Sequence, residues 1–180
     1  SRTIVTSEPT DFAPGEKIVV TAPHQEVTVQ ARIDEYTFTI IEPLAQTHTS
    51  EEWSTEGHDI DMRFEVALLS RNVIIQGAGL PRGDGTPTIG DDGEVASEKQ
   101  LFGAHTGAFH GGFYRIENTE LLHCGQSGVL GRYCMHFHVC GDNPAPNSYI
   151  KSNSIHHSFQ RATTVHGTHH ALVQNNVAYH

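Results

Sequence analysis

The sequence predicts an all-β protein, a right-handed parallel β-helix with stacked coils of about 23 residues, preceded by a short-stranded β region. Three observations favour this fold. The 180 residues include 17 glycines, and the apolar runs are short and rich in β-branched residues. No stretch has the periodicity of a long amphipathic helix. A repeat in the second half ends each of its blocks in histidine.

The first region reads as short strands separated by turns. Alternating and β-branched residues predict strands at residues 17–21, 26–29, 36–41, 64–69 and 73–76. The stretch 46–61 is polar and is expected to be a loop. Residues 77–100 are rich in glycine and acidic residues, and we expect them to form a long exposed excursion.

The repeat aligns residues 116–123, 150–157 and 173–180, with offsets of 34 and 23 residues. The first offset exceeds the second by 11 residues, and we expect the loop 141–148 to supply this excess. Stacked coils place equivalent residues about 4.8 Å apart. This predicts a histidine ladder of His123, His157 and His180, and asparagines at a turn, Asn118, Asn153 and Asn176. A second strand type, at 135–138 and 164–167, has a register that is ambiguous by one residue.

We therefore divide the chain into a β-rich segment, 1–62, and parallel β-helix repeats, 63–180, interrupted by the excursion at 77–100. The chain opens without methionine and stops inside a repeat, so we interpret it as part of a larger chain or assembly.

Charge is distributed unevenly along the chain. The formal net charge of −10 divides into −11 for residues 1–100 (7 basic, 18 acidic) and +1 for residues 101–180 (4 basic, 3 acidic). Eleven of the 14 histidines lie in the second stretch, which therefore becomes cationic below about pH 6.5. The acidic first half argues against nucleic acid as a partner, and no apolar run is long enough to span a membrane.

The three cysteines, Cys124, Cys134 and Cys140, leave at least one thiol without a partner in this chain. Cys134 and Cys140 flank a predicted strand, and their closeness in sequence suggests a small disulfide ring. No pair has the spacing of a zinc–thiolate site.

Several segments resemble a known family. The segments are 64–77, 101–106, 114–121, 131–138 and 161–170. They are similar to the G8 and parallel β-helix ectodomains of fibrocystin-like proteins and of CEMIP-type cell-surface hyaluronidases. The run Gly167–Val173 is closer to fibrocystin-L, and Cys134 stands where the family more often has proline. The resemblance implies an extracellular or cell-surface location, without implying one activity.

The candidate site lies in the His-rich second half. Strand alternation places His136 and His138 on one face, and His166 and His169 come from the next coil. These four could bind a divalent metal, the only cofactor that the sequence suggests. The alternatives are a structural ladder, in which each imidazole is hydrogen-bonded, and acid–base catalysis.

For catalysis, the second half offers few carboxylates, and Asp142 is the best single candidate. The first half could contribute Asp59, Asp61 or Glu65. A lyase-type mechanism would instead use His138 as base, with Arg132 neutralising charge. In that interpretation Arg161 and His166 bind the substrate.

Two functions follow. The first is a structural or glycan-recognition module of a large fibrocystin-like protein, whose partners are glycans or extracellular matrix and surface proteins. The alternative is a hyaluronan-type polysaccharide depolymerase that acts through the His/Arg cluster, with or without a divalent metal.

Overall fold

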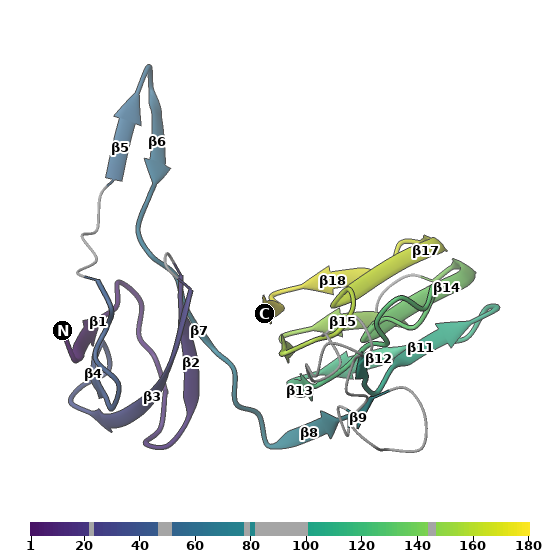
Figure 1. The fold of residues 1–180 in the computed structure, drawn as a ribbon. Coiled ribbons are helices and arrows are strands. Elements are labelled where there is room, and N and C mark those ends of the chain that lie inside the picture. The colour runs from purple at the N-terminus through teal and green to yellow at the C-terminus, as the bar shows by residue number, and fades with distance from the viewer. Residues whose placement is uncertain (22–23, 47–51, 78–79, 82–100, 144–146) are drawn as a thin grey trace. The chain divides into compact units, whose positions relative to one another are not determined.

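The computed structural model describes residues 1–21, 24–46, 52–77, 80–81, 101–143 and 147–180. Within these residues the protein is all-β, with nineteen strands and no helix, and so no helix long and apolar enough to cross a membrane. The chain forms two compact units, Ser1–Ser70 and Arg71–His180 (Figure 1). Most of the expected excursion, 78–79 and 82–100, lies outside the described residues.

The first unit is a five-stranded antiparallel sheet around its own core. In spatial order the strands are β1 (Thr3–Val5), β4 (Thr37–Ile40), β3 (Gln25–Arg32), β2 (Lys17–Val20) and β7 (Val66–Leu68). Alternate residues point inward, and the core contains fully buried Ile18, Val27, Val29 and Ile40. The predicted strand at 64–69 therefore pairs here, antiparallel to β2, although the sequence analysis placed it with the repeats.

The prediction of a loop at 46–61 is wrong for residues 52–61, which form two strands and a turn. β5 (Glu52–Thr55) and β6 (His58–Asp61) form a hairpin around Glu56 and Gly57, whose φ angles of 45° and 83° suit a tight two-residue turn. Every described residue of β6 is exposed, so neither strand shows the apolar alternation by which strands are recognised.

The second unit is built from three parallel sheets (Figure 1). Each turn of the chain contributes one strand to each sheet, and three consecutive turns lie side by side in register. In spatial order the sheets are β11 (Thr106–Phe109), β14 (Met135–Asp142) and β17 (Thr163–His169); β12 (Arg115–Glu117), β15 (Tyr149–Lys151) and β18 (Leu172–Gln174); and β8 (Val73–Gln76), β13 (Thr119–Leu122), β16 (Ser154–His156) and β19 (Val177–Tyr179). A short antiparallel pair, β9 (Leu80–Pro81) and β10 (Leu101–Phe102), accompanies them.

The register confirms the repeat. Ile116 pairs with Ile150 and Ile150 with Val173, at the offsets that the sequence predicted. Met135 pairs with Thr163, so the equivalent of 135–138 is 163–166 and the ambiguity of one residue is resolved. All three sheets contribute fully buried side chains to one core, among them Phe137, Ile150 and Leu121.

The asparagines form the predicted turn between the second and third sheets. Asn118 takes a positive φ of 51°, and Ser152 and Asn175 take 54° and 52° at the equivalent positions. The residues that follow Ser152 and Asn175 are Asn153 and Asn176, and Asn153 is fully buried. The Asn176 side-chain oxygen accepts hydrogen bonds from the backbone N–H and from the side chain of Asn153. This ladder supplies the backbone partners that a buried corner would otherwise lack.

The histidine ladder is also confirmed. His123, His157 and His180 all take positive φ angles, of 50°, 50° and 59°. Their ring centroids are 6.1 Å and 5.4 Å apart in successive coils.

The suggested ring between Cys134 and Cys140 is wrong. The disulfide joins Cys124 to Cys134, whose Cα atoms lie 5.0 Å apart, and Cys140 is a buried free thiol. Residues 135–140 run along β14, and six extended residues span about 20 Å, far beyond the reach of a disulfide.

Candidate functional site

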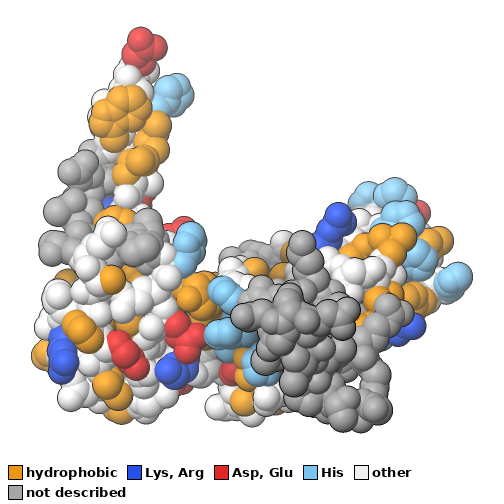
Figure 2. All heavy atoms as spheres, viewed as in Figure 1, with side chains coloured by type: hydrophobic (Ala, Val, Ile, Leu, Met, Phe, Trp, Pro, Cys, Tyr) orange, Lys and Arg blue, Asp and Glu red, His pale blue; other side chains and the backbone are white. Residues whose placement is uncertain are grey.

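The predicted site histidines lie on the outer face of the sheet β11–β14–β17. Met135 and Phe137 point into the core, so His136 and His138 point outward, as alternation predicted. Register places Phe109, His138 and His166 in one row across the three strands, and Gly107, His136 and Thr164 in the neighbouring row. Figure 2 shows histidine side chains gathered over this part of the second unit.

His138 and His166 are the closest pair in the row. Their Nδ1 atoms are 3.2 Å apart, so one imidazole donates a hydrogen bond to the other. His166 is exposed and His138 is half-buried, and both are within reach of a ligand from solvent. This pair can share one proton, or turn two N–H donors toward one anionic oxygen.

His136 is held rigidly beside this pair. It is 3% exposed, its ring centroid is 5.1 Å from that of His138, and its Nδ1 donates to the Gly131 carbonyl at 3.0 Å. Tyr133 packs edge-on against it, with ring centroids 4.9 Å apart. This arrangement fixes the tautomer of His136 and leaves the pair His138–His166 as the accessible part of the cluster.

A repeated backbone feature fixes the outer row. Val139 and Gly167 directly follow His138 and His166, and both have a φ of 54°. The strand register shifts here, between His138 and Gly141. A positive φ is costly for a β-branched residue, and such strain is found most often at functional sites.

Two arginines flank the cluster at the start of the strands. Arg132 donates to Nε2 of His105 at 2.5 Å, and the Arg161 guanidinium lies 5.5 Å from the centroid of the Tyr133 ring. Both arginines are exposed. They provide positive charge at neutral pH, before any histidine is protonated.

Asp142 and His169 lie beyond the register shift, at the far end of the same strands. They are paired with each other in the ladder, and the carboxylate of Asp142 is 3.7 Å from Nε2 of the exposed His170. The structure therefore does not bring Asp142 next to His138. Within the described part of the second unit, His136, His138, His166 and His169 do not place three ligand nitrogens within 4.8 Å of one another.

Burial lowers the pKa of two histidines near the cluster. Desolvation is the main cause for His136, and the neighbouring His138, His166 and His105 lower its pKa further, while the hydrogen bond that His136 donates to the Gly131 carbonyl raises it. Desolvation also lowers the pKa of His105, with Arg132 adding to the effect. Both imidazoles therefore favour the neutral form in the folded protein.

Acidification is expected to destabilise the second unit through His136. Its folded pKa is below the unfolded value of about 6.5, so its contribution to stability is complete above about pH 6.5 and is lost as the pH falls through the folded pKa. Thermal unfolding at about pH 7.5 and about pH 5.5 measures this loss. His136→Gln should reduce the pH dependence, whereas the control His170→Gln, at an exposed position, should not. An unchanged pH dependence in His136→Gln would contradict the assignment.

The structure also shows residues that the sequence analysis missed. His105 directly precedes β11, Phe109 is the last residue of β11, and Tyr133 lies shortly before β14. His105 and Tyr133 fall in segments that carry the family resemblance, whereas no sequence signal set Phe109 apart. On the third sheet, Glu120 and His156 form a buried pair at 3.0 Å, and Glu120 also accepts a hydrogen bond from the Arg71 backbone N–H. Glu120 is opposite Ser154 and Leu122 is opposite His156, so Glu120 and His156 lie two positions apart on the same face of neighbouring strands. This spacing could have suggested the pair.

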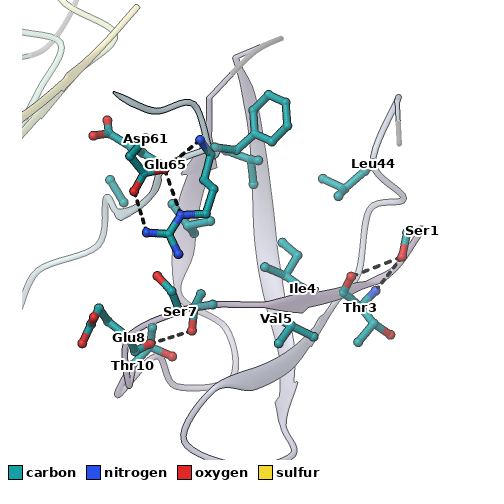
Figure 3. A pocket seen from close by; sticks show the side chains of 16 residues that line it. Ser1, Thr3, Ile4, Val5, Ser7, Glu8, Thr10, Leu44, Asp61 and Glu65 are labelled. Atoms are coloured by element: carbon teal, nitrogen blue, oxygen red, sulfur yellow. Dashed lines mark hydrogen bonds and ion pairs between the residues drawn. The ribbon is translucent and has the colours of Figure 1, made fainter. Parts of the chain in front are cut away.

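A cavity of about 960 Å³ lies within the first unit and contains none of the predicted site residues of the second half (Figure 3). Figure 3 shows Asp61 and Glu65 on one side of it, with Leu44 and Ser1 on the other. The Arg63 guanidinium donates two hydrogen bonds to the Asp61 carboxylate and the Arg63 backbone N–H donates a third, and together they lower the pKa of Asp61 to about 2. Asp61 is therefore ionised near neutral pH and cannot serve there as a general acid.

The second unit stacks successive turns of the chain as parallel strands, which is the architecture of repeat proteins. Within this class, the CEMIP beta-helix family model matches residues 101–180. This match, together with the relatives described below, confirms the resemblance seen in the sequence.

The relatives are much longer than this chain. Fibrocystin-L of Mus musculus is 32% identical over 98% of the chain, and the match covers 5% of that protein. Cell surface hyaluronidase of Danio rerio is 40% identical over 67% of the chain, and cell migration-inducing and hyaluronan-binding protein of Homo sapiens is 39% identical over 67%. Each of these two matches covers 9% of the relative. A G8 domain-containing protein of Dictyostelium discoideum is also similar, at 33% identity over 66% of the chain.

Proposed function

We propose that this chain is a structural and glycan-recognition module of a large, fibrocystin-like protein at the cell surface or outside the cell. The second unit would be a right-handed parallel β-helix, because connections between parallel strands of one sheet are almost always right-handed. Its ligand-binding face would be the outer face of β11–β14–β17. The names of two relatives, one of which refers to hyaluronan binding and one to a hyaluronidase, support an anionic glycan as the ligand.

One observation carries this proposal: two exposed arginines and the pair His138–His166 share one face of the second unit. The nearest described carboxylate on these strands, Asp142, lies beyond the register shift beside His170. The face is therefore complementary to carboxylate or sulfate groups.

The test uses the intact parent protein and immobilised hyaluronan. The double variant Arg132→Ala/Arg161→Ala should bind about three- to tenfold more weakly, and the loss should shrink at high salt because exposed ion pairs are weak and screened. Arg115→Ala is the matched control, since Arg115 is an exposed arginine on the second sheet whose partner is Asn147. No binding by the wild type, or equal losses in both variants, would reject the proposed face.

A depolymerase is the second candidate. It is favoured by the hydrogen-bonded pair His138–His166 next to Arg132, and by the hyaluronidase name of one relative. In this interpretation His138 acts as base and Arg132 neutralises a uronate, with Arg161 and His166 binding the polymer.

Polymer size distinguishes the two candidates. Hyaluronan would be incubated with the parent protein, with and without a chelator, and its length followed over time. Shortening that is lost in His138→Ala would establish the enzyme, and loss with the chelator would add a divalent metal. Hyaluronan that is retained by the protein but keeps its length supports the recognition module.

A further inference from the structure

Phe109 stands at one end of the row that also contains His138 and His166. It is the last residue of β11, and its side chain points outward because Ala108 before it is buried in the core. The ring is 49% exposed. A phenylalanine kept half in water gives up much of the stabilisation that burial would provide.

The surroundings of Phe109 hold its ring in place. The ring centroid is 5.9 Å from His138 and 6.0 Å from His136. Beside it, Gly107 has no side chain, and a Cβ at that position would lie 3.3 Å from the Phe109 ring and 2.6 Å from the His136 carbonyl oxygen. The ring is thus supported from one side by His136 and His138 while half of its surface faces solvent.

The spacing of the row is regular. Ring centroids are separated by 5.9 Å between Phe109 and His138 and by 5.0 Å between His138 and His166. Parallel strands impose this spacing, because neighbours in a sheet are about 4.8 Å apart. An apolar ring and a polar imidazole pair therefore occupy adjacent positions on one surface.

We propose that Phe109 is a sugar-stacking platform next to the anion-binding pair His138–His166. The ligand is then a polysaccharide in which anionic sugars alternate with uncharged ones. An anionic group binds the imidazoles and arginines, and the apolar face of the neighbouring sugar packs on the Phe109 ring. This inference rests on the proposed function and adds the feature that distinguishes a sugar from any other polyanion.

The experiment compares two polymers on the intact parent protein. Hyaluronan carries both alternating charge and sugar rings, whereas poly-L-glutamate carries charge without sugars. Phe109→Ala should weaken hyaluronan binding about three- to tenfold, in line with single aromatic contacts, and leave poly-L-glutamate binding unchanged. Phe109→Trp should retain hyaluronan binding. The double variant Arg132→Ala/Arg161→Ala should weaken both polymers.

Phe113→Ala is the matched control, because Phe113 is 63% exposed and lies outside the row. Equal unfolding temperatures of wild type and Phe109→Ala ensure that a loss of affinity is local. Wild-type hyaluronan affinity in Phe109→Ala, together with a loss in the arginine variant, would overturn the stacking platform and leave the proposed function standing. Equal weakening of both polymers by Phe109→Ala would also overturn it. Absence of hyaluronan binding by the wild type would remove the proposed function itself.

Discussion

Replacing Asn153 by alanine is expected to cost the second unit about 2–5 kcal/mol of its free energy of unfolding, because two buried backbone groups lose their partner. The Asn153 side chain donates to the Ile116 carbonyl at 3.1 Å and accepts from the Thr119 N–H at 3.0 Å. It also donates to Asn176 at 3.0 Å, which links the next coil. Asn153 is fully buried, so bulk solvent does not reach these backbone groups in the folded protein.

Chemical denaturation of the wild type and of Asn153→Ala measures this cost. Asn175→Gly is the control, since Asn175 is exposed and has a φ of 52°, which glycine adopts without strain. We expect that variant to be as stable as the wild type or slightly more stable. Equal stability of Asn153→Ala and the wild type would show that the turn does not depend on the ladder.

Removing the disulfide is expected to have a comparable effect. The bridge Cys124–Cys134 closes a loop with a sequence separation of 10, for which loop entropy gives about 3 kcal/mol. Both cysteines are fully buried, so Cys124→Ala/Cys134→Ala also leaves space in the core. The loop contains Gly131, whose carbonyl orients His136, so the proposed glycan binding should weaken along with stability.

Denaturation under non-reducing conditions tests this prediction, with Cys140→Ala as a control that removes a buried cysteine without removing a bridge. Thiol titration of the unfolded, non-reduced wild-type segment should find one free thiol among its three cysteines. Three free thiols, or a double variant as stable as the wild type, would refute the bridge.

The parallel part of the fold could be predicted because stacked coils place similar side chains at equivalent positions, which produces a repeat in the sequence. Ile116, Ile150 and Val173 lie at the same place in successive coils, so the same side-chain type recurs at the length of a coil. Histidine recurs for a related reason, since His123, His157 and His180 share one backbone conformation. The hairpin β5–β6 has no such trace, because exposed strands impose no apolar pattern.

Part of the candidate site could be predicted as well. Alternation along β14 placed His136 and His138 on the outer face, and the repeat placed His166 in the next coil with a register uncertain by one residue, which the structure resolves by pairing His166 with His138. Asp142, the carboxylate candidate that the sequence offered, lies at the end of β14, beyond the register shift between His138 and Gly141 and beside His170. Phe109 and His105 come from β11 and the residue before it, a strand that lies outside the aligned blocks, so only the fold could place them beside His136 and His138.

The in-register stacking also means that coils of different length can keep the same strand register. The coil with offset 34 carries 11 residues more than the one with offset 23, yet Ile116, Ile150 and Val173 remain in line. The register divides these 11 residues into six between β13 and β14 and five between β14 and β15, so the loop 141–148 does not supply the whole excess. The corner between β14 and β15 is therefore one natural insertion point, where peptides of other lengths could be grafted without disturbing the neighbouring coils. Because this corner directly follows the strand that carries His138, variation in its length offers a way to remodel the nearby surface while the scaffold stays the same.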